Sequence, residues 1–401
     1  MKRLSIVFFG LVVICLLFLG VVRLGYTEGI RGVTNDTVRV GLSLDLTGPT
    51  STVQRPILEA VKNFFSYVND QGGINGRRVK LIAEDDRYSI PVDMAVFKKF
   101  VFRDEALGLI LVLQEASINA ILPQITKHKV PGVILSMNEG AVIPTKRYLF
   151  QPVASYRDQI KVLFDYIMKD LKAKNPRIAF IAPDNSYGKD GYAAAQESAK
   201  HYGLQIVDRE FLSPGAIEAV SQVLLMKKAN PDFVVSHNYV DNSIALLRDA
   251  RKMKFSVPIL GGAGSCSDDL VKIAGKAAEN FIGGSPTVTW HTNTEGIKKM
   301  REVHKKYSPG TEDTPRTQIH ILGWITAMVF AEGLRQAGAN LTPDSFVDAL
   351  ETLKDFKTGD LSAPVTFGPD KHKGGESSMV FKADIEKERL VTLTGWRKPS
   401  F

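Results

Sequence analysis

The feature that most constrains the fold is an alternation of short apolar runs with amphipathic stretches, which begins at Thr37 and continues to the C-terminus. The run Val38–Leu44 predicts a strand, and Ile57–Asn69 predicts a helix with one apolar face, for which Pro56 suits a first helical position. Leu107–Leu113 is an uninterrupted apolar run, which is typical of a strand buried on both faces. Such strands, separated by helices, predict parallel sheets covered by helices on both sides.

The alternation falls into two series. In the first series, further strands are predicted at Val79–Ala83 and Val133–Ser136, with helices at Val92–Arg103 and Ser117–His128. In the second series, helices separate predicted strands at Arg177–Ala182, Gln205–Val207, Phe233–Ser236, Val257–Leu260 and Phe281–Gly284. Three more helices follow, and the tail contains short predicted strands at Val365–Phe367, Met379–Lys382 and Leu390–Thr394. Two series in 401 residues predict two doubly wound α/β lobes, because a domain usually takes roughly 150 residues.

The N-terminal segment predicts export. Lys2 and Arg3 precede an apolar stretch from Leu4 to Val22, in which Ser5 is the one polar side chain. The stretch is longer than the roughly 7–15 apolar residues of a usual signal peptide, and it is just long enough to span a bilayer. Residues 1–29 are therefore predicted to be a signal peptide or an uncleaved signal anchor. In both cases the remainder of the chain is exported, which predicts a periplasmic or other extracytoplasmic location.

The exported part lacks the patterns of common catalytic and cofactor sites. It has no phosphate-binding G-x-x-x-x-G-K-[ST] loop, no G-x-S-x-G nucleophile turn and no H-E-x-x-H zinc helix. The seven histidines show no metal-ligand spacing, and the net charge of +8 includes no basic run that indicates a nucleic-acid surface. We therefore expect no enzyme activity, no cofactor, no metal ion and no nucleic-acid partner. An exported, two-lobed chain of this kind points to binding.

The glycine-rich segment Gly261-Gly262-Ala263-Gly264 follows a predicted strand but lacks the third glycine and the acidic ribose partner of a dinucleotide site. We interpret it as a tight turn between a strand and a helix, with Ser267 as the helix cap.

Several motifs resemble one known family. They are Leu44-Asp45-Leu46-Thr47-Gly48-Pro49 after the first strand, Asn69–Arg78 after the first helix, Glu84-Asp85-Asp86 after the second strand, and the turn Asp184-Asn185-Ser186-Tyr187-Gly188 in the second series. In this order and spacing they resemble the periplasmic leucine/isoleucine/valine-binding family, the type I solute receptors of ABC transporters. The resemblance extends from Thr37 to Phe401.

The resemblance implies two α/β lobes joined by a hinge of three crossovers, with the ligand in the cleft between them. Lobe 1 is expected at residues 37–155 plus 287–358, and lobe 2 at residues 156–286 plus 359–401. It also implies a small-molecule ligand, an ABC-transporter membrane permease as partner, and a monomer. Membrane contact is expected only through the N-terminal segment, if that segment is not cleaved.

The resemblance also points to individual ligand-binding residues. Tyr187 and Tyr239 match tyrosines that pack against the ligand from the second lobe. Val53 stands where the branched-chain receptors carry an aromatic wall residue. In the loop where the family places a hydroxyl side chain to hold the ligand carboxylate, this chain has Glu115, with Ser117 two residues further on.

Three further positions depart from the amino-acid receptors. Asn138 and Glu139 occupy a loop where those receptors have a small-residue turn, and Ala263 stands where they carry the carboxylate that pairs with the ligand's α-ammonium. An ionised Glu115 would repel a ligand carboxylate. A simple branched-chain amino acid is therefore not the expected ligand, although backbone N–H groups, Glu139 or another carboxylate are left as alternative partners.

The function predicted from these features is capture of a small polar solute, from the amino-acid, amide or aromatic-acid class, and its delivery to an ABC-transporter permease. The alternative is a membrane-anchored ligand-sensing module with the same fold.

Overall fold

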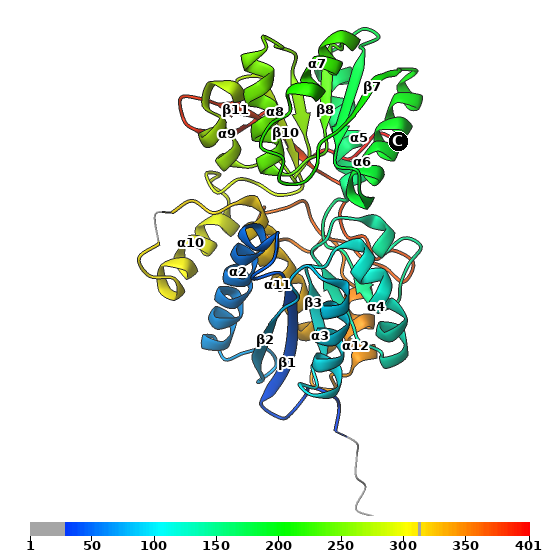
Figure 1. The fold of residues 1–401 in the computed structure, drawn as a ribbon. Helices are drawn as coiled ribbons and strands as arrows, with labels where there is room; N and C mark the ends of the chain where they lie inside the picture. Colours follow the sequence, from blue (N-terminus) through cyan, green and yellow to red (C-terminus); the bar gives the residue numbers. More distant parts are fainter. Residues whose placement is uncertain (1–28, 312–313) are drawn as a thin grey trace, which may run out of the picture.

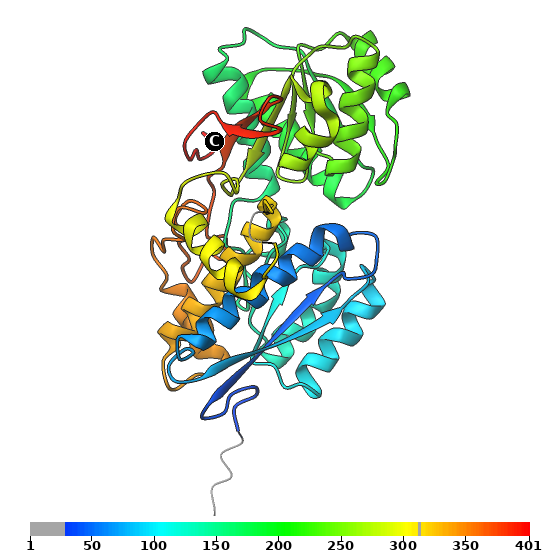
Figure 2. The same cartoon turned by 90° about the vertical axis from the view of Figure 1, so that its left-hand side faces the viewer.

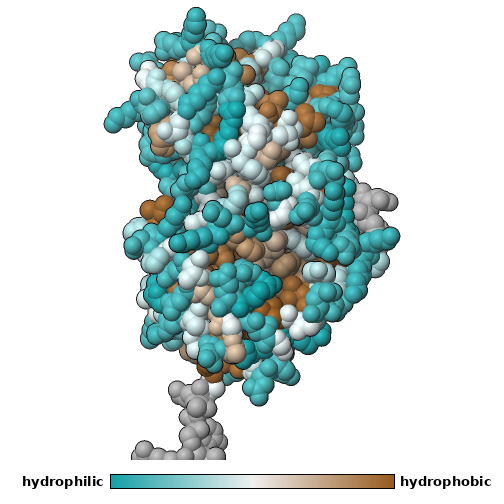
Figure 3. All heavy atoms as spheres, turned by 180° about the vertical axis from the view of Figure 1, so that it is seen from behind, coloured by the Kyte–Doolittle hydropathy of each residue, from teal (hydrophilic) through white to brown (hydrophobic). Residues whose placement is uncertain are grey.

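The computed structural model describes residues 29–311 and 314–401, whose strands form two separate sheets (Figure 1). The predicted signal or anchor segment lies outside these residues, apart from its last position. Within the described ranges, no helix is both long and apolar enough to cross a membrane. The face of the molecule seen from behind is mostly hydrophilic (Figure 3).

The first sheet has the strand order β2-β1-β3-β4-β5, and all of its strands are parallel. The strands are β1 (Thr37–Leu44), β2 (Arg78–Asp85), β3 (Gly108–Leu111), β4 (Gly132–Ile134) and β5 (Leu149–Phe150). Helices α2 (Ser51–Asp70), α11 (Gln318–Ala337) and α12 (Pro343–Glu351) pack together on one face, and α3 (Ile90–Phe102) and α4 (Glu115–His128) pack on the other. Because both faces are covered, β3 is buried at all four positions, as its apolar sequence predicts.

The second sheet has the order β12-β11-β10-β9-β8-β6-β7. Its strands are β6 (Ile178–Ala182), β7 (Ile206–Phe211), β8 (Phe233–Ser236), β9 (Ile259–Gly261), β10 (Phe281–Ser285), β11 (Met379–Asp384) and β12 (Arg389–Thr392). The first five strands of this sheet in chain order are parallel, and β11 and β12 continue it as an antiparallel pair. The covering helices are α5 (Tyr156–Asp165), α6 (Ser186–Tyr202), α7 (Val220–Ala229), α8 (Val240–Lys252) and α9 (Asp268–Ala274).

The chain passes between the two sheets three times, through residues 151–155, 286–294 and 352–378. Figure 2 shows the last passage as the orange-to-red segment that runs from the lower to the upper lobe. Each of the first two passages ends at a helix cap. Ser155 accepts a hydrogen bond from the Asp158 N–H at the start of α5, and Thr294 accepts one from the Ile297 N–H at the start of α10 (Glu295–Tyr307).

The exact limits of the two lobes remain a prediction. The Phe367 ring lies 5.1 Å from the Phe150 ring of the first sheet, and the Gly374 N–H donates to the Gln151 carbonyl at 2.7 Å. We therefore propose that residues 359–374 belong with lobe 1, so that the second lobe resumes close to β11.

Two local predictions were wrong. Helix α2 begins at Ser51, so Pro56 lies inside it; the helix extends upstream because Thr50 and Gln54 bond to Asp45. The segment Val365–Phe367 is not a strand, because Val365 pairs only with Phe356 in an isolated bridge. By contrast, Ser267 caps α9 as predicted, with its side chain accepting from the Asp269 N–H.

The loop after β1 is held by one buried carboxylate, that of Asp45. Its Oδ2 atom accepts from the Thr50 N–H at 2.7 Å and its Oδ1 atom from the Gly48 N–H at 2.5 Å. Gly48 lies so close to its surroundings that a Cβ atom there would be 2.7 Å from the Arg87 carbonyl oxygen. The loop and the start of α2 therefore have a defined position at the carboxyl end of the first sheet.

We predict that Gly48→Ala destabilises the protein by about 1–3 kcal/mol, because the new methyl group must displace backbone. Gly395→Ala is the matched control, since nothing lies within 4 Å of a Cβ atom at that position. Chemical denaturation of both variants measures the difference. Equal stability of the two variants would contradict the tight packing of this loop.

Candidate ligand-binding site

A cavity of about 290 Å³ lies between the two sheets and is lined from both of them. The loops after β1, β2, β3 and β4 contribute Thr50, Val53, Tyr88, Gln114, Glu115, Ser136 and Asn138, and the loops after β6 and β8 contribute Asn185, Ser186, Tyr187 and Tyr239. These loops follow the carboxyl ends of parallel strands, where ligands bind in open α/β sheets. The topology therefore explains why residues so far apart in sequence meet here.

Tyrosines form the wall of the cavity on the side of the second sheet. The ring of Tyr187 stacks on Tyr239 at 5.0 Å and meets Tyr156 edge-on at 4.9 Å. Among the described residues, the buried Tyr187 hydroxyl has no hydrogen-bond partner, and it lies against Gly264, where a side chain would collide with it. Burial raises the pKa of Tyr156, Tyr187 and Tyr239, so these hydroxyls stay neutral.

Tyr88 reaches this wall from the first sheet. Tyr88 and Tyr239 both line the cavity, and their side chains lie close enough to shift each other's pKa. Asp86 positions Tyr88 by accepting from the Tyr88 N–H at 2.9 Å, and burial raises the pKa of Asp86 to about 6.

Glu115 is the first residue of α4, and it supplies the carboxylate of the cavity. Its Oε2 atom accepts from the Asn138 amide at 3.0 Å, and the Asn138 Oδ1 atom accepts from the Gly140 N–H at 2.8 Å. Burial, assisted by the charge of Asp190, raises the pKa of Glu115. No Lys, Arg or His is among the described residues that line the cavity. The site therefore offers one acidic group and no cationic side chain.

Five of the eight residues proposed from the sequence line this cavity, namely Val53, Glu115, Asn138, Tyr187 and Tyr239. The other three lie elsewhere. Ser117 is fully buried and donates to Asp93, while Ala263 is 8% exposed and its N–H donates to Gln159 at 2.8 Å. Their positions give them no direct contact with the cavity in this structure.

Glu139 belongs instead to an ion network in the crossovers. It pairs with the Arg157 guanidinium at 3.2 Å and with the Lys373 ammonium at 3.0 Å, and Ser155 donates to it at 2.8 Å. Arg157 also pairs with Asp190 on α6 at 3.1 Å. The network thus connects a loop of the first sheet with a helix on the second.

Sequence reasoning missed Tyr88 and Tyr156, which both line the cavity. Tyr88 follows the acidic end of β2, a strand end that was not considered for ligand contact. Tyr156 opens α5 directly after the first crossover. In both cases the signal was available, because each is an aromatic residue at the end of a strand or crossover that faces the cleft.

Comparison with known proteins agrees with this geometry. The family model described as "Periplasmic binding protein" matches residues 37–388. "Leu/Ile/Val-binding protein homolog 1" of Brucella suis is 25% identical over 335 residues, which cover 81% of this chain and 85% of the relative.

Solved structures share the fold. A branched chain amino acid ABC transporter protein from Thermus thermophilus with bound valine superposes with a TM-score of 0.83 at 23% identity, covering 91% of this chain and 98% of that one. A fatty acid ABC transporter substrate-binding protein from Thermomonospora curvata has a TM-score of 0.80 at 20% identity and covers 93% and 96%. The named ligands of these two proteins differ.

The two-lobed fold is that of the type I periplasmic binding proteins. The chain belongs to the periplasmic binding protein family. The family consists of extracytoplasmic proteins that bind small molecules, associate with ABC transporters and are not enzymes.

We predict that Arg157→Met destabilises the protein by about 2 kcal/mol, somewhat less than the 3–5 kcal/mol for breaking a fully buried pair. The reason is that Glu139 and Asp190 lose their shared cation at a site where Arg157 is 18% exposed. Arg251→Met is the control, because its pair with Glu279 is exposed and such pairs contribute roughly 0–1 kcal/mol. Thermal and urea unfolding of both variants tests this, and equal losses would argue against the network.

Proposed function

We propose that this chain captures a small polar solute between its two lobes and delivers it to the permease of an ABC transporter. Family membership supports the general role. The cavity supports a small ligand, since its volume of about 290 Å³ lies at the lower end of ligand sites. The predicted signal or anchor segment is consistent with action outside the cytoplasm.

The observation that carries the choice of ligand is the charge of the lining. Glu115 is the acidic residue there, and the described lining contains no cationic side chain. The carboxylate of an α-amino acid or of an aromatic acid would depend on neutral donors alone and would lie near an acidic group. The α-ammonium could pair with Glu115 alone among the described lining residues, because Ala263, at the position of the family's counter-charge, is uncharged and lies outside the lining.

The ligand that fits best is a small solute with a cationic or amide N–H group. Such a group would donate to Glu115, which the Asn138 amide already holds in place. The remainder of the ligand would pack against the tyrosine wall, whose ring faces also attract cations. The sequence left amino acids, amides and aromatic acids open as ligand classes. The charge of the lining favours amides among them, and it makes amines a further candidate class.

We predict that leucine, isoleucine and valine bind no tighter than about millimolar, which corresponds to roughly −4 kcal/mol. Isothermal titration calorimetry measures this directly. In parallel, a thermal-shift screen over amides, amines, polyamines and aromatic acids should find its strongest stabilisers among the first three, because a tight ligand raises the melting temperature by mass action. Micromolar binding of any branched-chain amino acid would refute the proposed ligand class.

We also predict that binding of the solute found by the screen weakens as the pH falls. Glu115 attracts a cationic group and accepts most strongly when it is ionised, and burial raises its pKa above the ordinary value of about 4.3. Affinity should therefore be highest at pH values above the raised pKa of Glu115. As the pH falls through that pKa, affinity should decline, and the decline should begin at a higher pH than it would for an exposed glutamate. Glu115→Gln should bind more weakly and lose this pH dependence. If Glu115→Gln and the unmodified protein show the same dependence of affinity on pH, Glu115 does not contact the ligand.

A further inference from the structure

A second group of polar side chains lies outside the solute cavity, between three helices of the first lobe. Glu59 on α2, His304 on α10 and His320 on α11 present ligand atoms that all lie within 4.8 Å of one another. Their sequence spacing gave no sign of a metal site, because the two histidines are on different helices. The packing of α2 against α10 and α11 brings them together.

The distances suit a small metal ion. The Glu59 Oε1 atom lies 3.5 Å from His304 Nε2, and the Glu59 Oε2 atom lies 3.6 Å from His320 Nδ1. In a tetrahedral zinc site with bonds of about 2.0–2.1 Å, neighbouring ligand atoms are about 3.3–3.4 Å apart. Glu59 is thus close to the separation from each histidine that one shared ion requires, and slightly too far from both for good direct hydrogen bonds.

The orientation of His320 is the second observation. Its side chain is 1% exposed, and among the described residues its Nδ1 atom has no hydrogen-bond partner although it faces the Glu59 carboxylate. A lone pair on Nδ1 would face another acceptor there, and a cation between the two would satisfy both.

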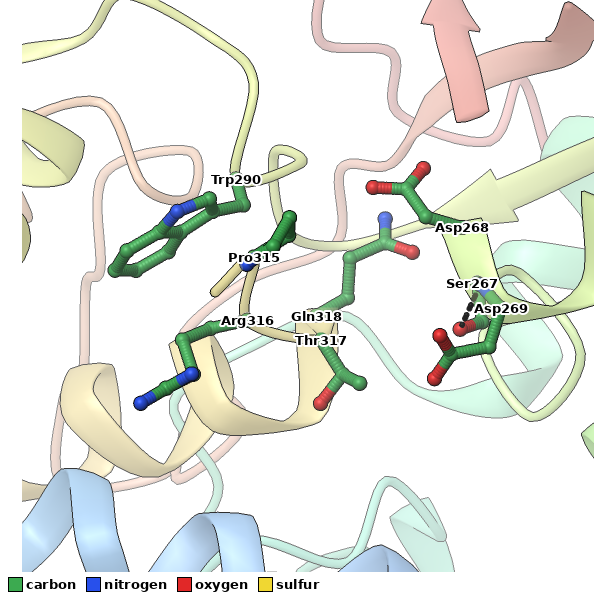
Figure 4. Close-up of a pocket in the computed structure, with 8 residues that line it drawn as sticks. All are labelled: Ser267, Asp268, Asp269, Trp290, Pro315, Arg316, Thr317 and Gln318. Atoms are coloured by element: carbon green, nitrogen blue, oxygen red, sulfur yellow. Dashed lines mark hydrogen bonds between the residues drawn. The ribbon is translucent and has the colours of Figure 1, made fainter. Parts of the chain in front are cut away.

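One cation already approaches this position, namely the guanidinium of Arg316. Its Nε atom lies 3.2 Å from Glu59 Oε2, and its Nη2 atom contacts His304 Nε2. Figure 4 shows Arg316 at the start of α11, extending on the side of Trp290 and away from Asp268 and Asp269, with which it lines a small cavity. A metal ion and this guanidinium cannot occupy the same position. The Arg316 side chain therefore competes with the ion and must adopt another conformation when the ion binds.

We propose that Glu59, His304 and His320 form a binding site for a late first-row divalent cation of the Zn²⁺ type. Two imidazoles and one carboxylate are ligands that suit zinc, cobalt, nickel or copper better than Mg²⁺ or Ca²⁺, which prefer oxygen. Three protein ligands leave one tetrahedral position for water. The occupied site would tie α10 and α11 to α2, next to the crossover residue Trp290, whose ring meets both histidines edge-on.

The surroundings provide access and support. Glu59 is 32% exposed and lines an open groove of about 370 Å³, through which an ion can enter from solvent. The amide of Asn63 lies 3.3 Å from His304 Nδ1. With its amide turned, Asn63 would accept from Nδ1–H, so that Nε2 could bind the metal in place of its present contacts with Thr311 and Arg316.

The test uses the purified protein without a histidine tag, stripped of metal and titrated with Zn²⁺ by calorimetry. We expect one ion per chain with micromolar affinity. Glu59→Gln and His320→Gln should weaken binding at least about tenfold, whereas Arg316→Gln should strengthen it, because the competing cation is gone. His201→Gln is the matched control, since His201 is exposed and far from the cluster in the fold.

Two results would overturn the proposal. One is the absence of stoichiometric Zn²⁺ binding by the unmodified protein, and the other is equal affinity in Glu59→Gln, His320→Gln and the His201→Gln control. Pulsed electron paramagnetic resonance of the Cu²⁺ form counts bound imidazoles and needs no variant. Two coordinated imidazoles support the site, and none or one contradicts it.

Discussion

Parallel strand pairing is the constraint on which the rest of this structure depends. Parallel neighbours cannot be joined by a tight turn, so each connection must cross the sheet, here mostly as a helix, and return to the same edge. The loops that leave the parallel strands therefore gather at the carboxyl ends, and the cavity between the two sheets is lined by these loops and the helix starts that follow them. The cavity is a consequence of this arrangement, and its position does not depend on which side chains line it.

The motifs that resemble the family act mainly on the position of these loops. Asp45 holds the turn after β1, and Asp85 accepts from the Leu46 N–H at 2.9 Å and from the Thr47 hydroxyl. Neither aspartate lines the cavity. Val53 and Glu115, which do line the cavity, belong to the first turns of α2 and α4. A protein can therefore keep the family's motifs and differ in its ligand, which is consistent with the different ligand names of its structural neighbours.

Most of the strands and helices could be predicted from the sequence, because burial of parallel strands and one-sided helices leaves a strong periodic pattern. The errors occurred where tertiary contacts override local preference. The Asp45 contacts extend α2 beyond Pro56, and Val365 pairs with Phe356 instead of joining a sheet. The cluster of Glu59, His304 and His320 was unpredictable for a related reason, since only helix packing brings together residues without local spacing.

Ligand binding by the residues named from the sequence stays a prediction, but the topology explains why some of them line the cavity. Positions directly after strands, such as Glu115 and Tyr187, reach the cavity because the topology alone places them there. Tyr88 and Tyr156 were missed because the end of β2 and the start of α5 were not weighed as parts of the cleft. Which way a loop residue points depends on contacts such as that between Asp86 and Tyr88, and no pattern in the sequence specifies those contacts.

Glu115 and Glu139 show how two nearby carboxylates acquire different roles. Glu139 is neutralised by Arg157 and Lys373, so its charge is already used in holding the crossovers. Glu115 forms no ion pair among the described residues; its partner is the neutral Asn138 amide, and Asp190 adds a like charge nearby. A half-buried carboxylate without a counter-charge is costly in free energy, and a ligand that carries a positive or N–H-rich group relieves that cost on binding. The charge that the fold leaves unmatched is thus the one that a solute can match.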